Sequence, residues 1–165
     1  MKDTTLKYAN ETLEIMNSIG LLLTVGDTHK NNVMTIGWGT LGTLWQKPIF
    51  TVFVRPTRYS FNLLEKHGEF TVNVPNISMK KETAFCGTKS GREFDKFKEL
   101  GFTLKSSGKL LVPYIKECKL IYECRVIYKH KLDPKIVPLD VSKDLYPKKD
   151  YHTVYYGEIV AVHKQ

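Results

Sequence analysis

The sequence lacks the features that mark several protein classes. None of its 165 residues belong to an apolar run approaching the roughly 20 residues that a membrane-spanning helix needs, and the start, Met1 to Thr5, has no apolar block typical of a secretory signal. The three cysteines form neither a CxxC pair nor an even disulfide framework, and no His/Cys cluster has the spacing of a metal site. We therefore expect a cytoplasmic protein with free thiols, no membrane association and no bound metal.

Acidic residues are also few relative to basic ones, with 17 Asp and Glu against 25 Lys and Arg, which gives a formal charge of +8. The basic residues are spread along the chain and form no single block, a distribution that suits phosphate-bearing partners in general. A nucleic acid, a phosphorylated cofactor, an acidic protein or solubility alone would each account for this charge. Composition by itself does not choose between them.

The hydrophobic pattern predicts one strand-rich domain spanning residues 1–165, with residues 1–19 as an N-terminal helical extension. Apolar and β-branched runs predict strands at 21–25, 33–37, 49–55, 70–74, 119–131 and 152–163. Helical spacing and capping residues predict helices after Asn10 and at 58–67, 78–85 and 93–100, and residues 135–150 form a surface excursion. Because the repeated βαβ alternation of a doubly wound fold is missing, we predict a mainly β fold, an antiparallel Greek-key barrel with accessory helices.

One motif is misleading. Residues 37–42 read Gly-Trp-Gly-Thr-Leu-Gly, which matches the G-x-G-x-x-G dinucleotide fingerprint. That fingerprint requires a helix that begins at the loop and meets the pyrophosphate, whereas here Pro48 leads into another strand. We interpret these residues as turn glycines between strands.

Two segments have the chemistry of a phosphate site. Residues 55–60, Arg-Pro-Thr-Arg-Tyr-Ser, combine two guanidinium groups and three hydroxyls where a strand ends and a helix begins, with Thr57 as the expected helix cap. Residues 88–92, Thr-Lys-Ser-Gly-Arg, place two cations and two hydroxyls in a loop before a helix, without the full Walker pattern. Solvated arginines on an ordinary surface helix would explain the first segment equally well.

A third segment, residues 32–38, ends a strand with small and aromatic residues that would let the backbone approach a flat ring while Trp38 packs on it. A core strand with a buried tryptophan has the same pattern. His152 is a candidate donor to such a ligand, although a lone histidine is more often structural. No nucleophile, base and orienting group can be aligned, so hydrolase chemistry has no support; we assign no catalytic side chain, and His152 stays a candidate only.

Taken together, these segments resemble the flavin reductase-like, flavoredoxin-type family. The similarity rests on ordered motifs from about Gly20 to the C-terminus. They are residues 32–39, 55–60, 69–75, 86–92 with 95–97, 117–118 with 123–126, and His152 with 157–160. The resemblance implies an FMN-binding split barrel that works as a homodimer, with FMN near the subunit interface, and that passes electrons through the flavin.

The resemblance also implies a set of cofactor-binding residues. Residues facing the isoalloxazine and ribityl would be Asn32 and the backbone of Met34, Thr35, Gly37 and Trp38, with His152 near the ring. Residues facing the phosphate end would be Arg55, Thr57, Tyr59 and Ser60, with Lys89, Ser90 and Gly91 as further phosphate or ribityl contacts. Lys89 or His152 is our hypothesis for a donor that stabilises the reduced flavin. The sequence departs from the family pattern at residues 40–47, on the substrate side of the pocket.

The expected function is that of an FMN-dependent oxidoreductase. It would be either an NAD(P)H:flavin reductase or an electron carrier that a redox partner protein reduces, because the flavin supplies the electron chemistry in both. A non-catalytic flavin-binding protein is one alternative. A nucleic-acid-binding barrel is the other, and it would need basic residues arranged as a stripe with aromatic platforms, an arrangement that the pattern does not favour. We therefore expect no nucleic acid among the partners.

Overall fold

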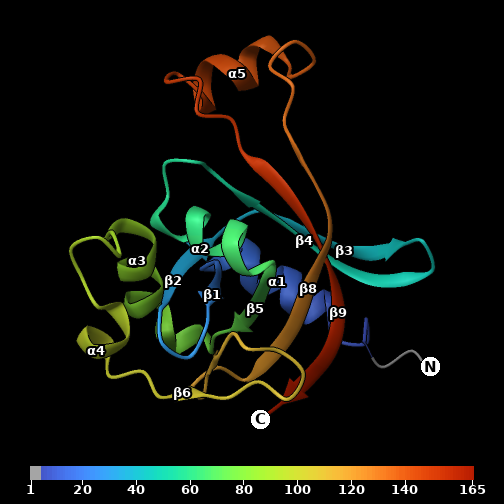
Figure 1. Ribbon diagram of the computed structural model, residues 1–165. Coiled ribbons are helices and arrows are strands. Elements are labelled where there is room, and N and C mark those ends of the chain that lie inside the picture. Colours follow the sequence, from blue (N-terminus) through green and yellow to red (C-terminus); the bar gives the residue numbers. More distant parts are fainter. Residues whose placement is uncertain (1–4) are drawn as a thin grey trace.

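A computed structural model of the protein describes residues 5–165, and most of its strands form one antiparallel sheet (Figure 1). The strands are β1 (Leu21–Gly26), β2 (Asn31–Ile36), β3 (Gly39–Leu44), β4 (Lys47–Val54), β5 (Glu69–Val74), β6 (Leu104–Lys105), β7 (Tyr114–Ile115), β8 (Leu120–Lys131) and β9 (Thr153–Lys164). The helices are α1 (Ala9–Ser18), α2 (Tyr59–His67), α3 (Lys80–Thr88), α4 (Lys96–Leu100) and α5 (Leu139–Leu145), with a 3-10 turn η1 (Ile77–Met79).

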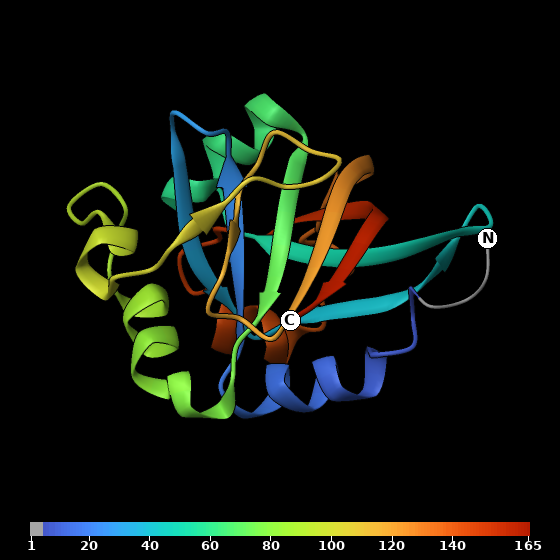
Figure 2. The same cartoon turned by 90° about the horizontal axis from the view of Figure 1, so that it is seen from below.

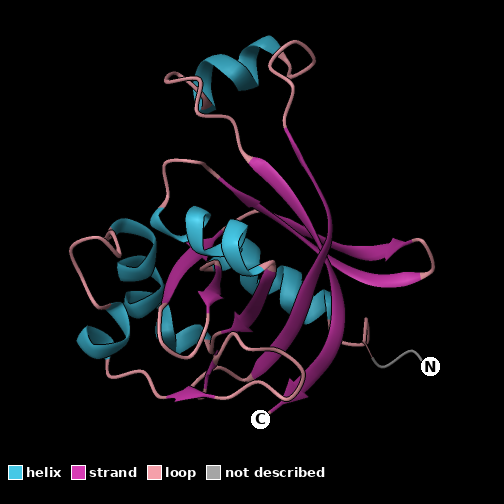
Figure 3. Ribbon diagram, in the orientation of Figure 1, coloured by secondary structure: helices cyan, strands magenta, loops and turns pink. Residues whose placement is uncertain are grey.

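Seven strands follow the order β2-β1-β5-β8-β9-β4-β3, and every neighbouring pair is antiparallel. β2 and β3 follow one another in the chain but lie at opposite ends of this order, so the curled sheet stays open between them. β6 and β7 pair separately as a short ribbon. The predicted mainly antiparallel β fold with accessory helices is confirmed, and Figure 3 shows helices α1 to α4 beside the sheet and α5 apart from them at the end of the two long strands.

Two apolar clusters hold the fold together, and β1 separates them. Leu21, Leu23 and Val25 belong to the main cluster, which fills the inside of the curled sheet. Leu22 belongs to a second cluster, which includes Cys86 of α3 and against which Phe97 of α4 packs. Because successive side chains of a strand face opposite ways, a strand buried on both faces must be apolar throughout, as residues 21–25 nearly are. Helices α3 and α4 therefore pack beside β1 and β2 (Figure 2).

Helix α1 closes one side of the main cluster. Met16 is buried there, and the Thr12 hydroxyl lies 2.8 Å from the Tyr122 hydroxyl of β8. The predicted cap at Asn10 is wrong, since the N-cap residue is Tyr8 and makes no side-chain capping bond. Residues 1–4 of the predicted N-terminal extension lie outside the described residues.

β8 and β9 are long strands whose paired ends project beyond the sheet and carry α5 (Figure 1). α5 lies within the predicted surface excursion and has no buried residue. The alternation along residues 119–131 places Glu123 on the polar face, opposite Tyr122 and Cys124, and predicts that it is solvated; the structure shows instead that Glu123 is completely buried. Its carboxylate accepts hydrogen bonds from the backbone N–H groups of Gly108 and Lys109, in a loop that covers this face.

The segment interpreted as turn glycines contains a strand. Gly39 to Leu44 pairs with β4, and Trp45 and Gln46 form the hairpin turn with φ of 51° and 61°, in the left-handed region. The two short helices after β5 are also displaced from their predicted positions: α3 continues through Thr88, so residues 86–88 are helical instead of loop, and α4 begins only at Lys96.

Candidate functional site

The start of α2 is shaped to receive an anion. Its N-cap residue is Arg58, in extended backbone conformation (φ −76°, ψ 140°), and it makes no side-chain capping bond. The predicted cap at Thr57 is wrong, since the Thr57 hydroxyl lies instead 3.5 Å from an oxygen of Asp150. The first N–H groups of a helix have no partner within the helix and carry partial positive charge, so this nine-residue helix offers donors at its start.

A first cavity of about 280 Å³ lies at this helix start. It is bounded by the end of β2, the start of α2, the end of α3 and the loop before α4. Its lining residues are Asn32, Met34, Thr35, Thr57, Arg58, Tyr59, Ser60, Cys86, Gly87, Thr88, Lys89, Ser90, Gly91, Arg92 and Lys96. This set of described residues contains four cationic side chains and no carboxylate, so the cavity has a strongly positive environment.

Close packing fixes the inner wall of the first cavity. The Asn32 amide of β2 donates a 2.8 Å hydrogen bond to the buried hydroxyl of Ser60 in α2. Gly91 packs against both elements, since a Cβ at Gly91 would lie 2.6 Å from Cδ1 of Tyr59 and would also collide with the Asn32 side chain. Glycine is therefore required at residue 91 for the loop before α4 to approach β2 and α2 this closely.

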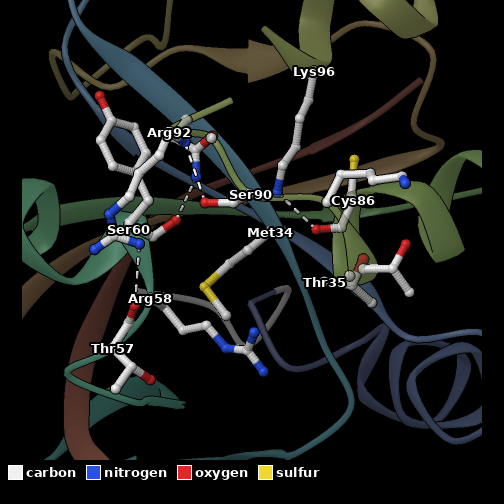
Figure 4. Close-up of a pocket in the computed structure, with 15 residues that line it drawn as sticks. Met34, Thr35, Thr57, Arg58, Ser60, Cys86, Ser90, Arg92 and Lys96 are labelled. Atoms are coloured by element: carbon white, nitrogen blue, oxygen red, sulfur yellow. Dashed lines mark hydrogen bonds between the residues drawn. The ribbon is translucent and has the colours of Figure 1, made fainter. Parts of the chain in front are cut away.

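Two cations of the first cavity lie in contrasting environments (Figure 4). Arg92 is exposed, donates a 3.2 Å hydrogen bond to the Thr57 carbonyl and lies 5.7 Å from the centre of the Tyr59 ring. Lys96 is only 3% exposed, and its ammonium donates 2.8 Å hydrogen bonds to the carbonyls of Val33 and Cys86. Burial lowers the pKa of Lys96 and raises the pKa of the neighbouring Cys86 thiol to about 11, so this thiol is protonated at neutral pH.

A second cavity of about 170 Å³ adjoins the first and shares Met34, Thr35 and Arg58 with it. It lies where the sheet is open, between the end of β2 and β4. Its lining residues are Met34, Thr35, Ile36, Gly37, Trp38, Phe53, Arg55, Arg58 and His152. A Cβ placed on Gly37 would meet no atom within 4 Å, so the backbone here faces open space.

His152 is held firmly in the second cavity. Its Nδ1 lies 2.7 Å from the Tyr146 hydroxyl, and its ring centre lies 5.0 Å from that of Trp38. Burial and the nearby Arg55 guanidinium lower the pKa of His152 to about 4, against a partial opposing effect of Asp150. His152 is therefore neutral at pH 7, and its ring can take part in hydrogen bonds without adding charge.

All thirteen residues predicted to bind the cofactor line one of the two cavities. Arg55 differs from its expected position. Its guanidinium donates 2.8 Å hydrogen bonds to Asp150 and to the Leu145 carbonyl and lies 5.0 Å from the centre of the Tyr146 ring. Arg55 thus holds the segment that carries α5 and lines the second cavity. Thr57, Tyr59 and Ser60 line the first cavity, at the start of α2.

The predicted set omitted several lining residues. Arg58 lines both cavities, Lys96 lies beneath the first, and Arg92 crosses from the loop to the start of α2. Arg58 and Arg92 lie in the two segments, 55–60 and 88–92, whose composition is that of a phosphate site. That composition could have identified both residues from the sequence. Lys96 stood in the family motif at residues 95–97, but its local pattern gave no sign of burial, because a lysine near the start of a charged helix is ordinarily solvated.

Comparison with known proteins agrees with this geometry. The open antiparallel barrel with accessory helices is a split-barrel fold, shared with a split-barrel domain protein from Shewanella frigidimarina (18% identity, 99% of this chain and 75% of that chain, TM-score 0.70). The model of the flavin reductase like domain matches residues 15–165. The chain therefore belongs to the flavin reductase like domain family.

Individual proteins from archaea are also similar to this chain in sequence. An uncharacterised protein from Archaeoglobus fulgidus is 36% identical over 115 residues, which cover 70% of this chain and 64% of that protein, so the match spans less than two thirds of that relative. One from Pyrococcus abyssi is 32% identical over 143 residues, 85% of this chain and 70% of that protein. Among solved structures, the flavoredoxin from Methanosarcina acetivorans is 30% identical (89% and 69% of the two chains, TM-score 0.68).

Proposed function

We propose that this protein is a flavoprotein oxidoreductase that binds FMN across the two adjoining cavities and passes electrons through it. The observation that carries this proposal is the joining of a cationic cavity at a helix start to a cavity with aromatic walls and open backbone. A ligand with an anion at one end and a flat ring at the other matches that pair. The flavoredoxin from Methanosarcina acetivorans and the FMN-binding protein from Thermus thermophilus (22% identity, 89% and 70% of the two chains, TM-score 0.70) have the same fold.

The first cavity fits the phosphate of FMN. The α2 start supplies backbone donors, Ser60 and Ser90 supply hydroxyls, and Arg58 and Arg92 supply guanidinium groups. No carboxylate among the described residues lines the cavity to repel a phosphate. The two cavities of about 280 and 170 Å³ together lie within the usual size range of small-molecule sites, about 300–1,000 Å³.

The second cavity fits the isoalloxazine ring. Gly37, directly after β2, leaves the backbone open to a flat ring, and the Trp38 side chain, 44% exposed, lies beside it. Bound flavin accepts a hydride and releases electrons singly or in pairs. The residues of the chain would hold and orient it, and neutral His152, fixed by Tyr146, would offer a hydrogen bond at the ring end without adding charge.

The electron donor is NAD(P)H or a redox partner protein. Purified protein is expected to be yellow, with FMN identified by mass after release, and anaerobic NADH and NADPH additions then separate the two cases. Bleaching by a nicotinamide alone supports a flavin reductase, whereas a stable yellow colour favours a carrier that a protein partner reduces over a reductase. Colourless protein that takes up no added FMN would refute the flavin proposal.

We also propose that the protein forms a homodimer. The β3–β4 hairpin projects from the body and ends in Trp45, which is 63% exposed, with its ring 6.0 Å from that of Tyr128. Exposed aromatic side chains on a projecting hairpin are typical of association surfaces. Sedimentation equilibrium should give a dimer for the wild type and a weaker dimer for Trp45→Glu; a monomeric wild type would contradict this proposal.

A further inference from the structure

Lys96 is a buried cation beneath the first cavity. Lys96 is the first residue of α4, and its ammonium donates a hydrogen bond to the carbonyl of Cys86 in α3 (Figure 4) and another to the carbonyl of Val33 in β2. Both partners are neutral, and within residues 5–165 Lys96 takes part in no ion pair. A charge that is 3% exposed and lacks a counterion is costly, because two carbonyls do not replace the water it has lost.

The surroundings of Lys96 offer no anion to offset this cost, but the first cavity lies beside it. Lys96 is one of the cavity's lining residues, and the other charged residues of that lining, Arg58, Lys89 and Arg92, are also cationic. An ammonium has three donors, two of which bind Val33 and Cys86. An anion placed in the cavity would therefore interact with a poorly solvated positive charge, where electrostatic interactions are stronger than at the surface.

We propose that Lys96 is the positioning residue that selects a phosphorylated flavin over its unphosphorylated form, with its buried charge balanced when the phosphate binds. This inference rests on the proposed function of the first cavity. Desolvation, which lowers the pKa of Lys96 in the free protein, is consistent with a charge that has no counterion before the ligand arrives. A purely structural lysine that only tied β2 to α3 would instead support binding of both ligands equally.

The test compares the affinities of the flavin-free protein for FMN and for riboflavin, which has the same ring and ribityl chain but no phosphate. Flavin fluorescence titrations of the wild type, Lys96→Met and Lys96→Gln give both constants. Lys98→Met is the matched control, because Lys98 lies on the same helix but is exposed and outside the cavity lining. Lys96→Gln keeps a hydrogen-bond donor but removes the charge. If Lys96→Met does not fold, Lys96→Gln still allows the FMN and riboflavin affinities to be compared.

The expected result is a loss of at least about tenfold in FMN affinity for both Lys96 variants, with riboflavin affinity within about threefold of the wild type. Inorganic phosphate should raise the thermal midpoint of the wild type and of Lys98→Met but not that of the Lys96 variants. Equal losses for FMN and riboflavin, or no loss for FMN, would overturn the role of Lys96. Wild-type protein that binds neither flavin would instead refute the proposed function itself.

Discussion

Acidification should destabilise this protein through His152. This side chain is 8% exposed, and its pKa falls from 6.5 to about 4 because burial and the Arg55 guanidinium disfavour the charged ring. Above pH 6.5 the ring is neutral in both the folded and the unfolded chain. Between pH 6.5 and 4 the unfolded chain binds a proton that the folded chain does not, so the stability contributed by neutral His152 is lost as the pH falls.

The size of this effect follows from the two pKa values. Each pKa unit of difference corresponds to about 1.4 kcal/mol, so the contribution of His152 to the free energy of unfolding should fall by about 2 kcal/mol between pH 7 and pH 5. Urea unfolding of the flavin-free protein at both pH values measures the total loss. His152→Asn provides the reference, because asparagine does not titrate while every other ionisable group is retained.

The wild type should therefore lose about 2 kcal/mol more than His152→Asn over this pH range. Direct titration of the His152 ring by NMR should give a midpoint near pH 4. Equal losses for the two proteins, within about 0.5 kcal/mol, would refute the assignment of His152 as a buried neutral residue. A ring midpoint near 6.5 would refute it as well.

Three core substitutions should lower the free energy of unfolding measured in urea. Glu123→Gln should cost about 2 kcal/mol, because a fully buried carboxylate that accepts two backbone N–H bonds loses its charge. Gly157→Ala should cost about 1–3 kcal/mol, since the added Cβ would lie 2.7 Å from Cε1 of the buried Phe70 ring. Tyr155→Phe should cost about 1.5 kcal/mol by removing the hydroxyl that donates a 2.7 Å hydrogen bond to Glu65.

A surface ion pair serves as the control for these substitutions. Glu158 pairs with Lys47 at 2.6 Å, but both side chains are partly exposed, so Glu158→Gln should cost less than about 1 kcal/mol. A loss for Glu158→Gln as large as that for Glu123→Gln would contradict the distinction between buried and surface carboxylates. Core substitutions that change stability by less than about 0.5 kcal/mol would contradict the packing described at those residues.

Local pattern was sufficient to find much of the fold. The run at residues 21–25 and the alternation along 119–131 predicted β1 and β8, because side-chain period and β-branched content are local properties. The strand at Gly39–Leu44 was missed because its two glycines have low strand propensity, and it is formed by pairing with β4. Glu123 was misplaced for a related reason, since alternation cannot show that a distant loop covers one face of a strand.

In the candidate site, too, sequence motifs identified some residues, whereas others are placed by tertiary contacts that the sequence does not show. Asn32, Ser60 and Gly91 were predicted from ordered motifs, and the structure brings them into contact. The pairing of Arg55 with Asp150 joins residues 95 positions apart, and no local pattern indicates it. Lys96 is buried only because α4 packs against β2, a tertiary contact that composition and spacing do not encode.

The central claim is that the two cavities form one flavin site, and a crystal structure of the protein with FMN tests it most directly. The phosphate should lie at the start of α2, within reach of Ser60, Ser90 and Arg92, and the ring should lie against the open backbone of Gly37 beside Trp38. Flavin bound outside these cavities, or with its ring at the α2 start and its phosphate beside Trp38, would contradict this account.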